Sequence, residues 1–416
     1  MRQTKTEAIF LLALTRVYML EYPKTAKRQM KTILFIIDML TGSRVHKLAG
    51  AREVCSQHGY HIEEIETSRI EDPLEKVVRY WAPAGCIIDD SGSNMSDTSA
   101  FADVPVVHLD PCEKVLLSPH DFTVSSDNRQ IADLAVAELV KTGCKHFAFF
   151  GWNKQIGWSY RRQERFCELL KRMNRPFSVM DDTSAFYDKT MLATRSRPFL
   201  AALPRPCGIF AANDDFAATI LDICTADGIR IPGDMFVVGV DDDPVVCDNL
   251  RPSLSSVRPG FVNAGRIAMS LLAKMIDNPH MPVEKKLYHP LGITSRLSTR
   301  HVVAQSKRVL SAIDLIRREA CHGLKASDVV MAFGTSERQA EIEFKNATGK
   351  RITQEITDVR FEHVFELLMR PSQAIAPIAN LCGWDSDIYL KRLFKQRMGM
   401  TMREWRAAHL DNPTKR

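Results

Sequence analysis

Two stretches near the carboxyl end of the chain repeat one pattern: a short helical segment, a turn that contains glycine, and a longer helical segment that ends in Phe-Lys. The first copy spans residues 326–345 and the second spans residues 375–395. A helix-turn-helix places its second helix in the major groove of DNA. Two copies therefore predict an all-α domain with two helix-turn-helix units that reads adjacent segments of a double-stranded operator or promoter.

The distribution of charge supports this assignment. Residues 305–416 contain 19 Lys and Arg against 14 Asp and Glu, whereas residues 31–304 contain 31 against 34. The first 30 residues contain 6 basic and 2 acidic side chains. A basic end on a slightly acidic body is typical of a polyanion-binding module attached to a neutral sensor. Chance variation of surface charge is the alternative interpretation.

Composition excludes several other classes of protein. The ten cysteines include no CxxC motif and no Cys/His cluster, so the sequence predicts no metal site, no cofactor and no disulfide framework. Unpaired cysteines of this kind indicate a reducing, cytoplasmic location. The sequence contains no apolar run of about 18 residues, so we expect no membrane partner.

The first 30 residues are expected to be a disordered or wrongly assigned extension, with Met30 as an alternative start. Residues 8–14 look like the apolar core of a signal peptide, which is the alternative interpretation. Arg16 interrupts this core early, and no small-residue cleavage site follows it.

From Lys31 onward the chain alternates between strand-like and helix-like patterns. The strand-like runs span residues 32–37, 60–65, 85–89, 104–109, 146–151, 208–212 and 236–240. Several of them are continuous apolar runs, as in parallel strands that are buried on both faces. The alternation predicts doubly wound α/β sheets, which bind ligands beyond the carboxyl ends of their strands.

Polar residues follow several of these strands. They are Asp38, Asp110, Asn213, Asp214 and Asp241. Their oxygens would accept hydrogen bonds from vicinal hydroxyl groups, and charged acceptors form the stronger bonds. The pattern therefore favours a neutral polyol such as a sugar. For each residue taken alone, a helix cap is an equally good explanation.

Three further side chains fit a sugar site. Arg162 would donate to ring or hydroxyl oxygens, and Trp152 and Trp158 would offer an apolar face to a sugar ring. The two tryptophans fit a hydrophobic core equally well.

The body of the chain resembles the effector-binding domain of LacI/GalR-type regulators. The resemblance rests on residues 126–143, 145–151, 209–217, 228–234, 237–242 and 251–257, in matching order and spacing. It implies a two-lobed, periplasmic-binding-protein-like fold with three crossovers, which closes on a small effector, usually a sugar or a nucleobase. It marks Asp110, Arg162, Asn213 and Asp241 as effector contacts, with Asp38 and Asp214 as further candidates. The amino-terminal helix-turn-helix of that family is absent, because Lys31 leads directly into the first strand.

The repeated region resembles the DNA-binding domain of the AraC/XylS family, most closely in residues 375–384, 394–395 and 399–406. A LacI-type sensor joined to such a domain is similar to the architecture of bacterial xylose-operon regulators. The resemblance implies a transcription regulator that is controlled by a small effector, a sugar such as a pentose. It also implies a homodimer, with RNA polymerase as a further partner. Hinge closure of the lobes on the effector would re-orient the DNA-reading domains of the dimer.

In the second repeat, Leu390, Leu393 and Phe394 share one helical face and are expected to form the core of the unit. The remaining faces would contact DNA. Ile388, Tyr389 and Arg392 are expected to contact bases, and Lys391 and Lys395 are expected to contact phosphates. Asp385 or Ser386 would cap the helix, and Ser386 is also near enough to the groove to contact DNA. Arginine can bond guanine O6 and N7 in a bidentate manner, whereas phosphate contacts carry no sequence information. A solvated surface arginine is the alternative for Arg392.

The first repeat departs from the family pattern. Ala340 stands where a large apolar residue is usual, and Glu337, Glu341 and Glu343 make the second helix acidic. By position, the residues that would face the groove are Ser336, Arg338, Glu341 and Ile342. Glu341 could accept from cytosine N4. Repulsion between the glutamates and phosphates predicts that the second repeat dominates the reading of DNA.

These patterns divide the chain into an extension (1–30), an effector-binding domain (31–294), a polar linker (295–305) and a twin helix-turn-helix domain (306–410). Three rival functions stay open: a cleft that binds a non-sugar ligand or only dimerises, a sugar-binding transport component, and an enzyme. Transport does not explain the basic helical domain. No GxSxG, P-loop, HExxH or GxGxxG motif stands in a suitable context, so we predict no enzyme activity.

Overall fold

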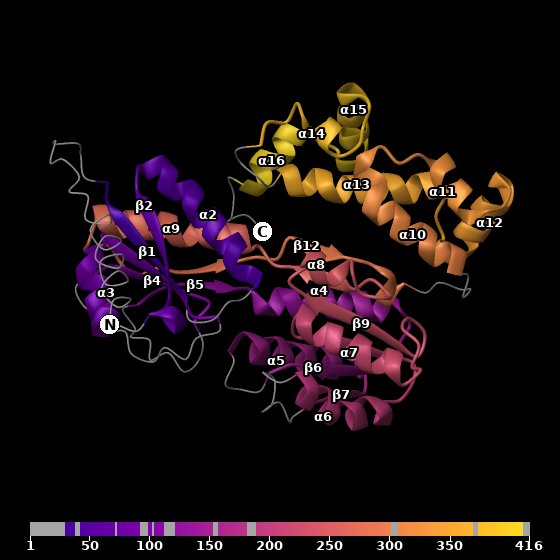
Figure 1. Ribbon diagram of the computed structural model, residues 1–416, viewed down its shortest axis with the longest axis horizontal. Coiled ribbons are helices and arrows are strands. Elements are labelled where there is room, and N and C mark those ends of the chain that lie inside the picture. The colour runs from indigo at the N-terminus through magenta and orange to yellow at the C-terminus, as the bar shows by residue number, and fades with distance from the viewer. Residues whose placement is uncertain are drawn as a thin grey trace, which may run out of the picture.

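The computed structural model describes residues 30–37, 42–70, 73–91, 99–101, 104–111, 121–152, 157–180, 189–300, 307–368 and 373–410. It confirms the predicted fold class, because two α/β lobes lie side by side and an all-helical domain lies along one side of them (Figure 1). No helix within the described ranges has the length and apolar character needed to cross a membrane.

The first lobe is built on a six-stranded parallel sheet with the order β11-β5-β4-β3-β1-β2. Its strands are β1 (Thr32–Ile37), β2 (His61–Glu66), β3 (Gly85–Asp89), β4 (Val106–Leu109), β5 (Phe122–Ser126) and β11 (Lys285–Tyr288). Its helices are α2 (Gly42–His58), α3 (Leu74–Trp81) and α9 (Phe261–Asp277), with the 3-10 turns η1 (Thr67–Arg69) and η2 (Ser99–Phe101).

The second lobe has a six-stranded sheet with the order β12-β10-β9-β8-β6-β7, in which only the β10–β12 pair is antiparallel. Its strands are β6 (His146–Phe150), β7 (Phe177–Val179), β8 (Cys207–Ala211), β9 (Met235–Val240), β10 (Ser255–Arg258) and β12 (Gly292–Thr294). Its helices are α4 (Asn128–Lys141), α5 (Gly157–Arg172), α6 (Lys189–Ala202), α7 (Asp214–Ala226) and α8 (Pro244–Cys247). The chain crosses between the lobes after β5, β10 and β11, as the resemblance implied.

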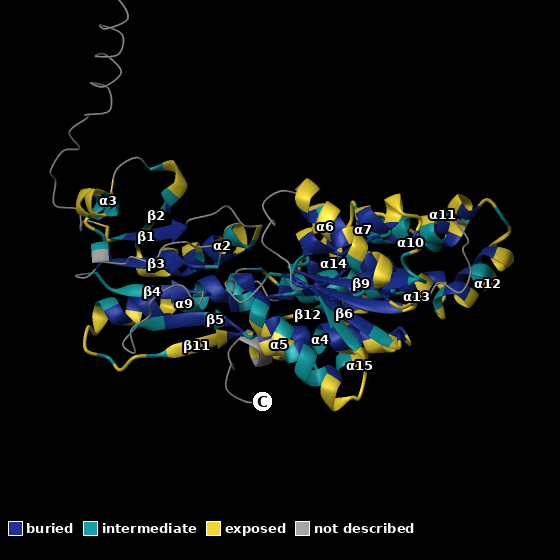
Figure 2. Cartoon of the chain, turned by 90° about the horizontal axis from the view of Figure 1, so that it is seen from below, coloured by how far each residue is buried: buried dark blue, intermediate teal, exposed yellow. Residues whose placement is uncertain are grey.

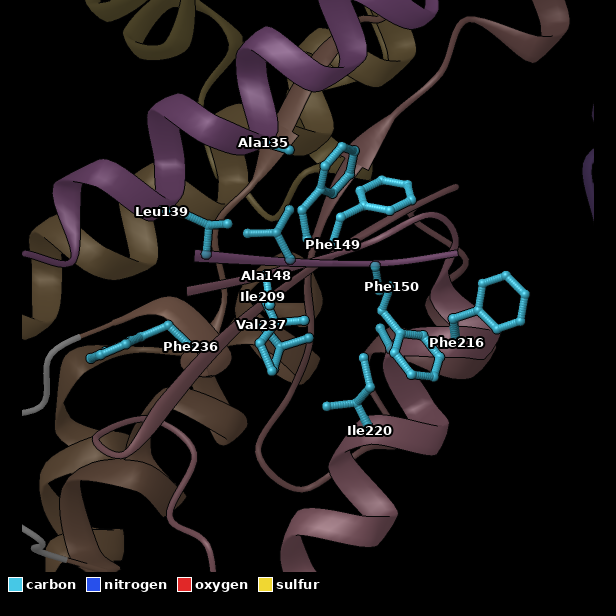
Figure 3. Packing of buried hydrophobic residues seen from close by; sticks show 14 of the residues in the cluster. Ala135, Leu139, Ala148, Phe149, Phe150, Ile209, Phe216, Ile220, Phe236 and Val237 are labelled. Atoms are coloured by element: carbon cyan, nitrogen blue, oxygen red, sulfur yellow. The ribbon is translucent and has the colours of Figure 1, made fainter. Parts of the chain in front are cut away.

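Continuous apolar strands explain the core of each lobe. In the second lobe the side chains of Phe149, Phe150 and Ile209 are fully buried between the sheet and helices α4 and α7 (Figure 3). Phe149 meets Phe210 edge to face at 5.3 Å between ring centroids, a geometry that adds to the free energy gained from burial. Figure 2 shows the strands as buried bands in both lobes, with exposed residues on the outer helices.

Helices α2 and α9 of the first lobe pack at unusually short range because of two glycines. A Cβ added to Gly50 would lie 1.9 Å from the Val262 carbonyl oxygen, and one added to Gly265 would lie 1.8 Å from the Lys47 oxygen. Only glycine allows such contact between backbones. The packing fixes α2, which carries Lys47 towards the crevice between the lobes.

The helical domain consists of two units that share one long helix, α13. Its helices are α10 (Lys307–Glu319), α11 (Ala326–Phe333), α12 (Glu337–Thr348), α13 (Ile352–Leu368), α14 (Ile378–Leu381), α15 (Asp387–Met398) and α16 (Met402–Leu410). Val359 on α13 belongs to the core of the first unit, whereas Phe361 and Val364 belong to the core of the second. The turns before α12 and α15 contain Gly334 and Gly383 with positive φ.

The first half of the predicted linker is packed against the protein. Arg296, Leu297 and Ser298 are buried, and the latter two belong to the 3-10 turn η3 (Leu297–Thr299). Leu297 joins the core of the first helix-turn-helix unit. Residues 295–300 are therefore a structured connection that contacts both the sensor and the helical domain.

Candidate effector cleft and DNA-binding surface

A buried lysine lies at the carboxyl ends of the strands of the first lobe. Lys47 on α2 is fully buried, and its Nζ lies 2.9 Å from Asp89 Oδ1 and 2.8 Å from Asp110 Oδ2. Burial alone would lower the pKa of Lys47, but the two carboxylates outweigh that effect and raise it above its ordinary value. Lys47 is therefore a fixed ammonium group at the edge of the crevice.

Asp110, a predicted effector contact, lies directly after β4 and is held by donors of its own lobe. Besides Lys47, its oxygens accept from the Tyr288 hydroxyl at 2.6 Å and from the Ser126 backbone N–H at 2.8 Å. Its φ is 50°, in the left-handed region that non-glycine residues rarely adopt and that is often found at functional sites.

Arg162 enters the crevice from α5 of the second lobe. Its Nε donates to Asn128 Oδ1 at 2.9 Å and its Nη1 to the Ala212 carbonyl at 2.5 Å. Its guanidinium group stacks over the Trp158 ring at 4.7 Å. Burial lowers the pKa of Arg162, although Asp241 counteracts this effect most strongly. The arginine is thus oriented on three sides before any ligand binds.

Asp241 follows β9 and faces Arg162. Its φ is 123° and that of the following Asp242 is 53°, so two successive residues hold strained backbone conformations at this strand end. Burial raises the pKa of Asp241 to about 7, although the charges of Arg162 and Lys47 act in the opposite direction. Lys47 belongs to the first lobe, so Asp241 lies within electrostatic range of the opposite side of the crevice.

Two other predicted site residues, Asn213 and Asp214, accept hydrogen bonds from neighbouring groups of the protein. Asn213 is the N-cap of α7, and its side-chain oxygen accepts from the Phe216 N–H at 3.0 Å. Asp214 is buried and accepts from the Ser256 hydroxyl at 2.6 Å and from the Asp243 N–H at 3.0 Å. Asp214 therefore fixes the loop that carries Asp241. The side-chain oxygen of Asn213 caps a helix, which is the alternative that the sequence left open for this residue. Asp38 lies outside the described residues.

The two predicted tryptophans have different surroundings. Trp158 donates its Nε1–H to the Ser91 carbonyl at 2.9 Å, which is a hydrogen bond from the second lobe to the first. Trp152 packs edge to face on Phe216 at 5.6 Å, and it covers the hydrophobic core. The sequence analysis did not identify Lys47. A signal was present, because Lys47 lies four residues before Ala51 and seven before Val54, and this spacing places it on the buried face of α2.

The second helix-turn-helix unit presents the predicted DNA contacts on its surface. Ile388 is 76 % exposed and Tyr389 is 46 % exposed, while Leu390 and Phe394 are fully buried. Arg392 lies over the Tyr389 ring at 5.6 Å. Lys391 and Lys395 are also exposed, and Lys391 pairs with Asp387 at 2.6 Å. Ser386 is the N-cap and accepts from the Tyr389 N–H at 3.3 Å, so one predicted contact also begins the helix.

The first unit has the same architecture with different chemistry. Ser336 caps α12 by accepting from the Gln339 N–H at 3.4 Å, and Ala340 is fully buried. Arg338 and Ile342 are exposed, and Glu341 is half-buried. Helix α12 carries two basic and three acidic side chains, whereas α15 carries four basic and one acidic side chain. The electrostatic attraction to phosphates is therefore stronger at α15.

Charged side chains connect the sensor to the helical domain. Arg296 donates to Asp242 at 2.6 Å and to Asp248 at 2.8 Å. Arg317 on α10 donates to the Ser295 carbonyl and pairs with Glu362 on α13 at 3.5 Å. Arg258 at the end of β10 pairs with Glu366 on α13 at 2.8 Å.

A cavity of about 340 Å³ lies at this junction and reaches from the crevice to the helical domain. Its lining includes His46 of the first lobe, Asp241 and Asp242 of the second, and Glu362 and His363 of α13. Within the described ranges, no group of three or more His, Cys, Asp and Glu side chains is placed to hold a metal ion.

Comparison with known proteins agrees with this division. Residues 136–299 match the periplasmic binding protein-like domain family, and residues 329–408 match a helix-turn-helix domain family. The chain is 30 % identical over 292 residues to the xylose operon regulatory protein of Haemophilus influenzae, covering 69 % of this chain and 75 % of that protein. The chain belongs to the family of xylose operon regulatory proteins.

Two further relatives align with nearly the whole chain. The xylose operon regulatory protein of Escherichia coli (strain K12) is 28 % identical over 386 residues, which are 91 % of this chain and 97 % of that protein. A solved structure described as the xylose-binding transcription activator xylR has a TM-score of 0.56 and 25 % identity, covering 92 % of this chain and 99 % of that chain. This xylose operon regulator homologue is therefore a DNA-binding transcription regulator with a sensor domain of the sugar-binding type.

Proposed function

We propose that the regulator binds a pentose, D-xylose or a close stereochemical relative, in the crevice between its lobes, and that binding changes how the helical domain engages an operator. The protein would act in the cytoplasm as a homodimer and contact RNA polymerase from its DNA-bound state. Relatives that carry xylose in their names support the choice of sugar.

The observation that carries this proposal is the set of ionisable groups that both lobes place at the crevice. The first lobe supplies Lys47 with Asp110, and the second supplies Arg162 with Asp241. A ring with vicinal hydroxyls offers both donors and acceptors, so it can bond carboxylates and cations at once. Because the groups come from both lobes, a bound sugar would stabilise the closed arrangement.

The loop after β9 offers a route from the crevice to DNA. Asp241 would contact the sugar, and the adjacent Asp242 accepts from Arg296, which lies in the segment that leads to the helical domain. Arg317 then links that segment to α13, because it donates to the Ser295 carbonyl and pairs with Glu362. A shift of the loop on closure would therefore move the helix that both DNA-reading units share.

We infer that α15 reads most of the operator sequence and that α12 contributes less. Exposed Arg392, Ile388 and Tyr389 are available for base edges, with Lys391 and Lys395 for phosphates. On α12 only Arg338 is a cation on the expected base-reading face, beside Glu341.

The sugar assignment is tested by titration calorimetry on the full chain with D-xylose, D-ribose, L-arabinose, D-glucose and xylitol. We expect D-xylose to bind most tightly and to raise the melting temperature, as a ligand of the native state must. Arg162→Lys should weaken binding at least tenfold, because lysine cannot reproduce the planar fork. Arg230→Lys, on an exposed pair with Asp234, is the matched control and should bind as the parent does. Equal binding by Arg162→Lys, or no binding of any pentose, would contradict the proposal.

A further inference from the structure

Two cysteines from different helix-turn-helix units meet beside α13. Cys321 lies in the 3-10 turn η4 (Ala320–His322) between α10 and α11, and Cys382 is the C-cap of α14. Cys382 is fully buried in the core of the second unit, and the half-buried Cys321 packs against that core. The two cysteines interact strongly enough that each shifts the pKa of the other.

The backbones that carry these thiols are in direct contact. A Cβ added to Gly383, the residue after Cys382, would lie 2.9 Å from the Cys321 carbonyl oxygen and 2.7 Å from the Ala320 oxygen. Arg360 on α13 holds the same turn from the other side by donating to the Ala320 carbonyl at 2.8 Å and the Leu324 carbonyl at 2.9 Å. The backbone segments that carry the two cysteines are therefore held against each other.

A histidine activates one of the two thiols. His363 interacts electrostatically with Cys321, and its Nδ1 lies 3.2 Å from Glu366 Oε2. The hydrogen bonds from Cys382 and His363 lower the pKa of Cys321 to about 5, and the same contacts with Cys321 and Glu366 raise the pKa of His363 to about 10. The hydrogen bond to Cys321 and burial raise the pKa of Cys382. One member of the pair is thus a thiolate and its neighbour is a thiol.

We propose that Cys321 and Cys382 form a peroxide-sensitive thiol pair, whose disulfide ties the two helix-turn-helix units together and weakens DNA binding. The effect on DNA rests on the proposed reading of DNA by both units, whereas formation of the disulfide does not.

The chemistry needs only hydrogen peroxide as oxidant. The Cys321 thiolate attacks one peroxide oxygen, the O–O bond breaks, and the leaving hydroxide takes a proton from the His363 imidazolium to become water, which leaves Cys321 as a sulfenic acid. The Cys382 sulfur then attacks the Cys321 sulfur, Cys382 loses its proton, and the sulfenic hydroxyl leaves with that proton as a second water. The thiolate and the thiol together lose two electrons, and one hydrogen peroxide is reduced to two waters.

The disulfide would change the spacing of the DNA-reading helices. A disulfide requires a distance of about 2.0 Å between sulfur atoms, which is shorter than the hydrogen-bonded contact of two thiols. Formation of the bond therefore draws η4 towards the end of α14, and it moves the unit that carries α12 relative to the unit that carries α15. Two helices that must fit adjacent groove segments tolerate little change in their relative position.

The test exposes the full chain to hydrogen peroxide at pH 7, blocks the remaining thiols with N-ethylmaleimide, and maps the cysteines by mass spectrometry. We expect a disulfide between Cys321 and Cys382 that dithiothreitol reverses, formed at least tenfold faster than any oxidation of the half-buried Cys167 in the sensor. In Cys382→Ser the reaction should stop at a sulfenic acid on Cys321, which dimedone traps. A missing disulfide, or equal rates at Cys321 and Cys167, would overturn the proposal.

His363→Gln separates activation from packing. It should slow the oxidation of Cys321 at least tenfold and move the pH midpoint of its alkylation upward from about 5, whereas His322→Gln on the same turn, whose side chain is 75 % exposed, should change neither quantity. Unchanged kinetics in His363→Gln would refute the activation. DNA affinity of the oxidised chain should fall at least threefold, and that of peroxide-treated Cys321→Ser should not. If the oxidised chain kept its DNA affinity, the proposed effect of the disulfide on DNA binding would be wrong. If the reduced chain had no DNA affinity, the proposed function would be wrong instead.

Discussion

At the scale of single residues, the sensor concentrates opposite charges at the ends of its strands and compensates each one. Lys47 is held between Asp89 and Asp110, and Arg162 is oriented by Asn128 and by the Ala212 carbonyl. Buried charges are tolerated only when they are paired and hydrogen-bonded. The crevice is therefore polar and rigid before a ligand arrives, which lowers the entropic cost of binding.

The buried lysine gives a direct test of this compensation. Lys47→Met leaves the carboxylates of Asp89 and Asp110 without their cation, so we expect a loss of about 3–5 kcal/mol in the free energy of unfolding of the sensor. Lys286→Met removes an exposed partner of Glu284 and should cost less than about 1 kcal/mol. Urea denaturation followed by circular dichroism measures both. Equal losses in the two variants would mean that Lys47 is not held as described.

Asp241 should make stability depend on pH. The folded carboxyl group keeps its proton up to about pH 7, whereas an unfolded aspartic acid loses it near pH 4. The folded state thus binds more protons between these values, and stability falls as the pH rises through that window. Asp241→Asn removes this pH-dependent contribution to the free energy of unfolding. The variant should therefore be more stable than the parent at pH 8, by up to a few kcal/mol, and the difference should be much smaller at pH 4. A difference in melting temperature that does not change with pH would contradict the assignment.

At the scale of elements, sequence periodicity predicted the strands because they are apolar on both faces and fully buried, as β1, β3, β8 and β9 show. It did not reveal β5, β7, β10, β11 and β12. These strands have three to five residues, which is too short for a clear periodic pattern, and β11 exposes three of its side chains. Their positions depend on the crossovers and not on local sequence.

The candidate site was predictable only in part, because sequence places a side chain at a strand end without naming its partner. Asp110 and Arg162 lie at the crevice, and their contact with an effector stays a prediction. Asn213 and Asp214 lie at a strand end as well, but their oxygens are occupied by the N–H of Phe216 and by Ser256. Lys47 was missed because its contacts are formed with strands 42 or more residues away.

The two faces of α15 should separate selectivity from affinity. Arg392→Ala should reduce discrimination between operator and random DNA by about 1–3 kcal/mol, the contribution of a bidentate base contact. Lys395→Ala should weaken binding to both DNAs alike and should reduce the salt dependence by about one phosphate contact. Fluorescence anisotropy at several salt concentrations measures both effects. Selectivity that survives in Arg392→Ala would mean that another face of α15 lies in the groove.

At the scale of the whole molecule, ion pairs join the sensor to the helical domain. Arg258 with Glu366 and Arg251 with Asp314 cross this junction, beside the cavity that reaches Asp241. Burial raises the pKa of Glu362, and Arg317 counteracts it. Such polar junctions can have two arrangements of similar free energy, and a ligand in the crevice could select one of them.

The central claim is that a pentose in the crevice controls the affinity of the helical domain for DNA. The most direct test is the dissociation constant of the full chain for its operator, with and without saturating D-xylose, in the parent and in Arg296→Met. We predict a change of about 5- to 150-fold in the parent, as is typical of coupled sites, and a much smaller change in Arg296→Met with sugar binding intact. An operator affinity that D-xylose leaves unchanged in the parent, although the sugar binds, would contradict the account.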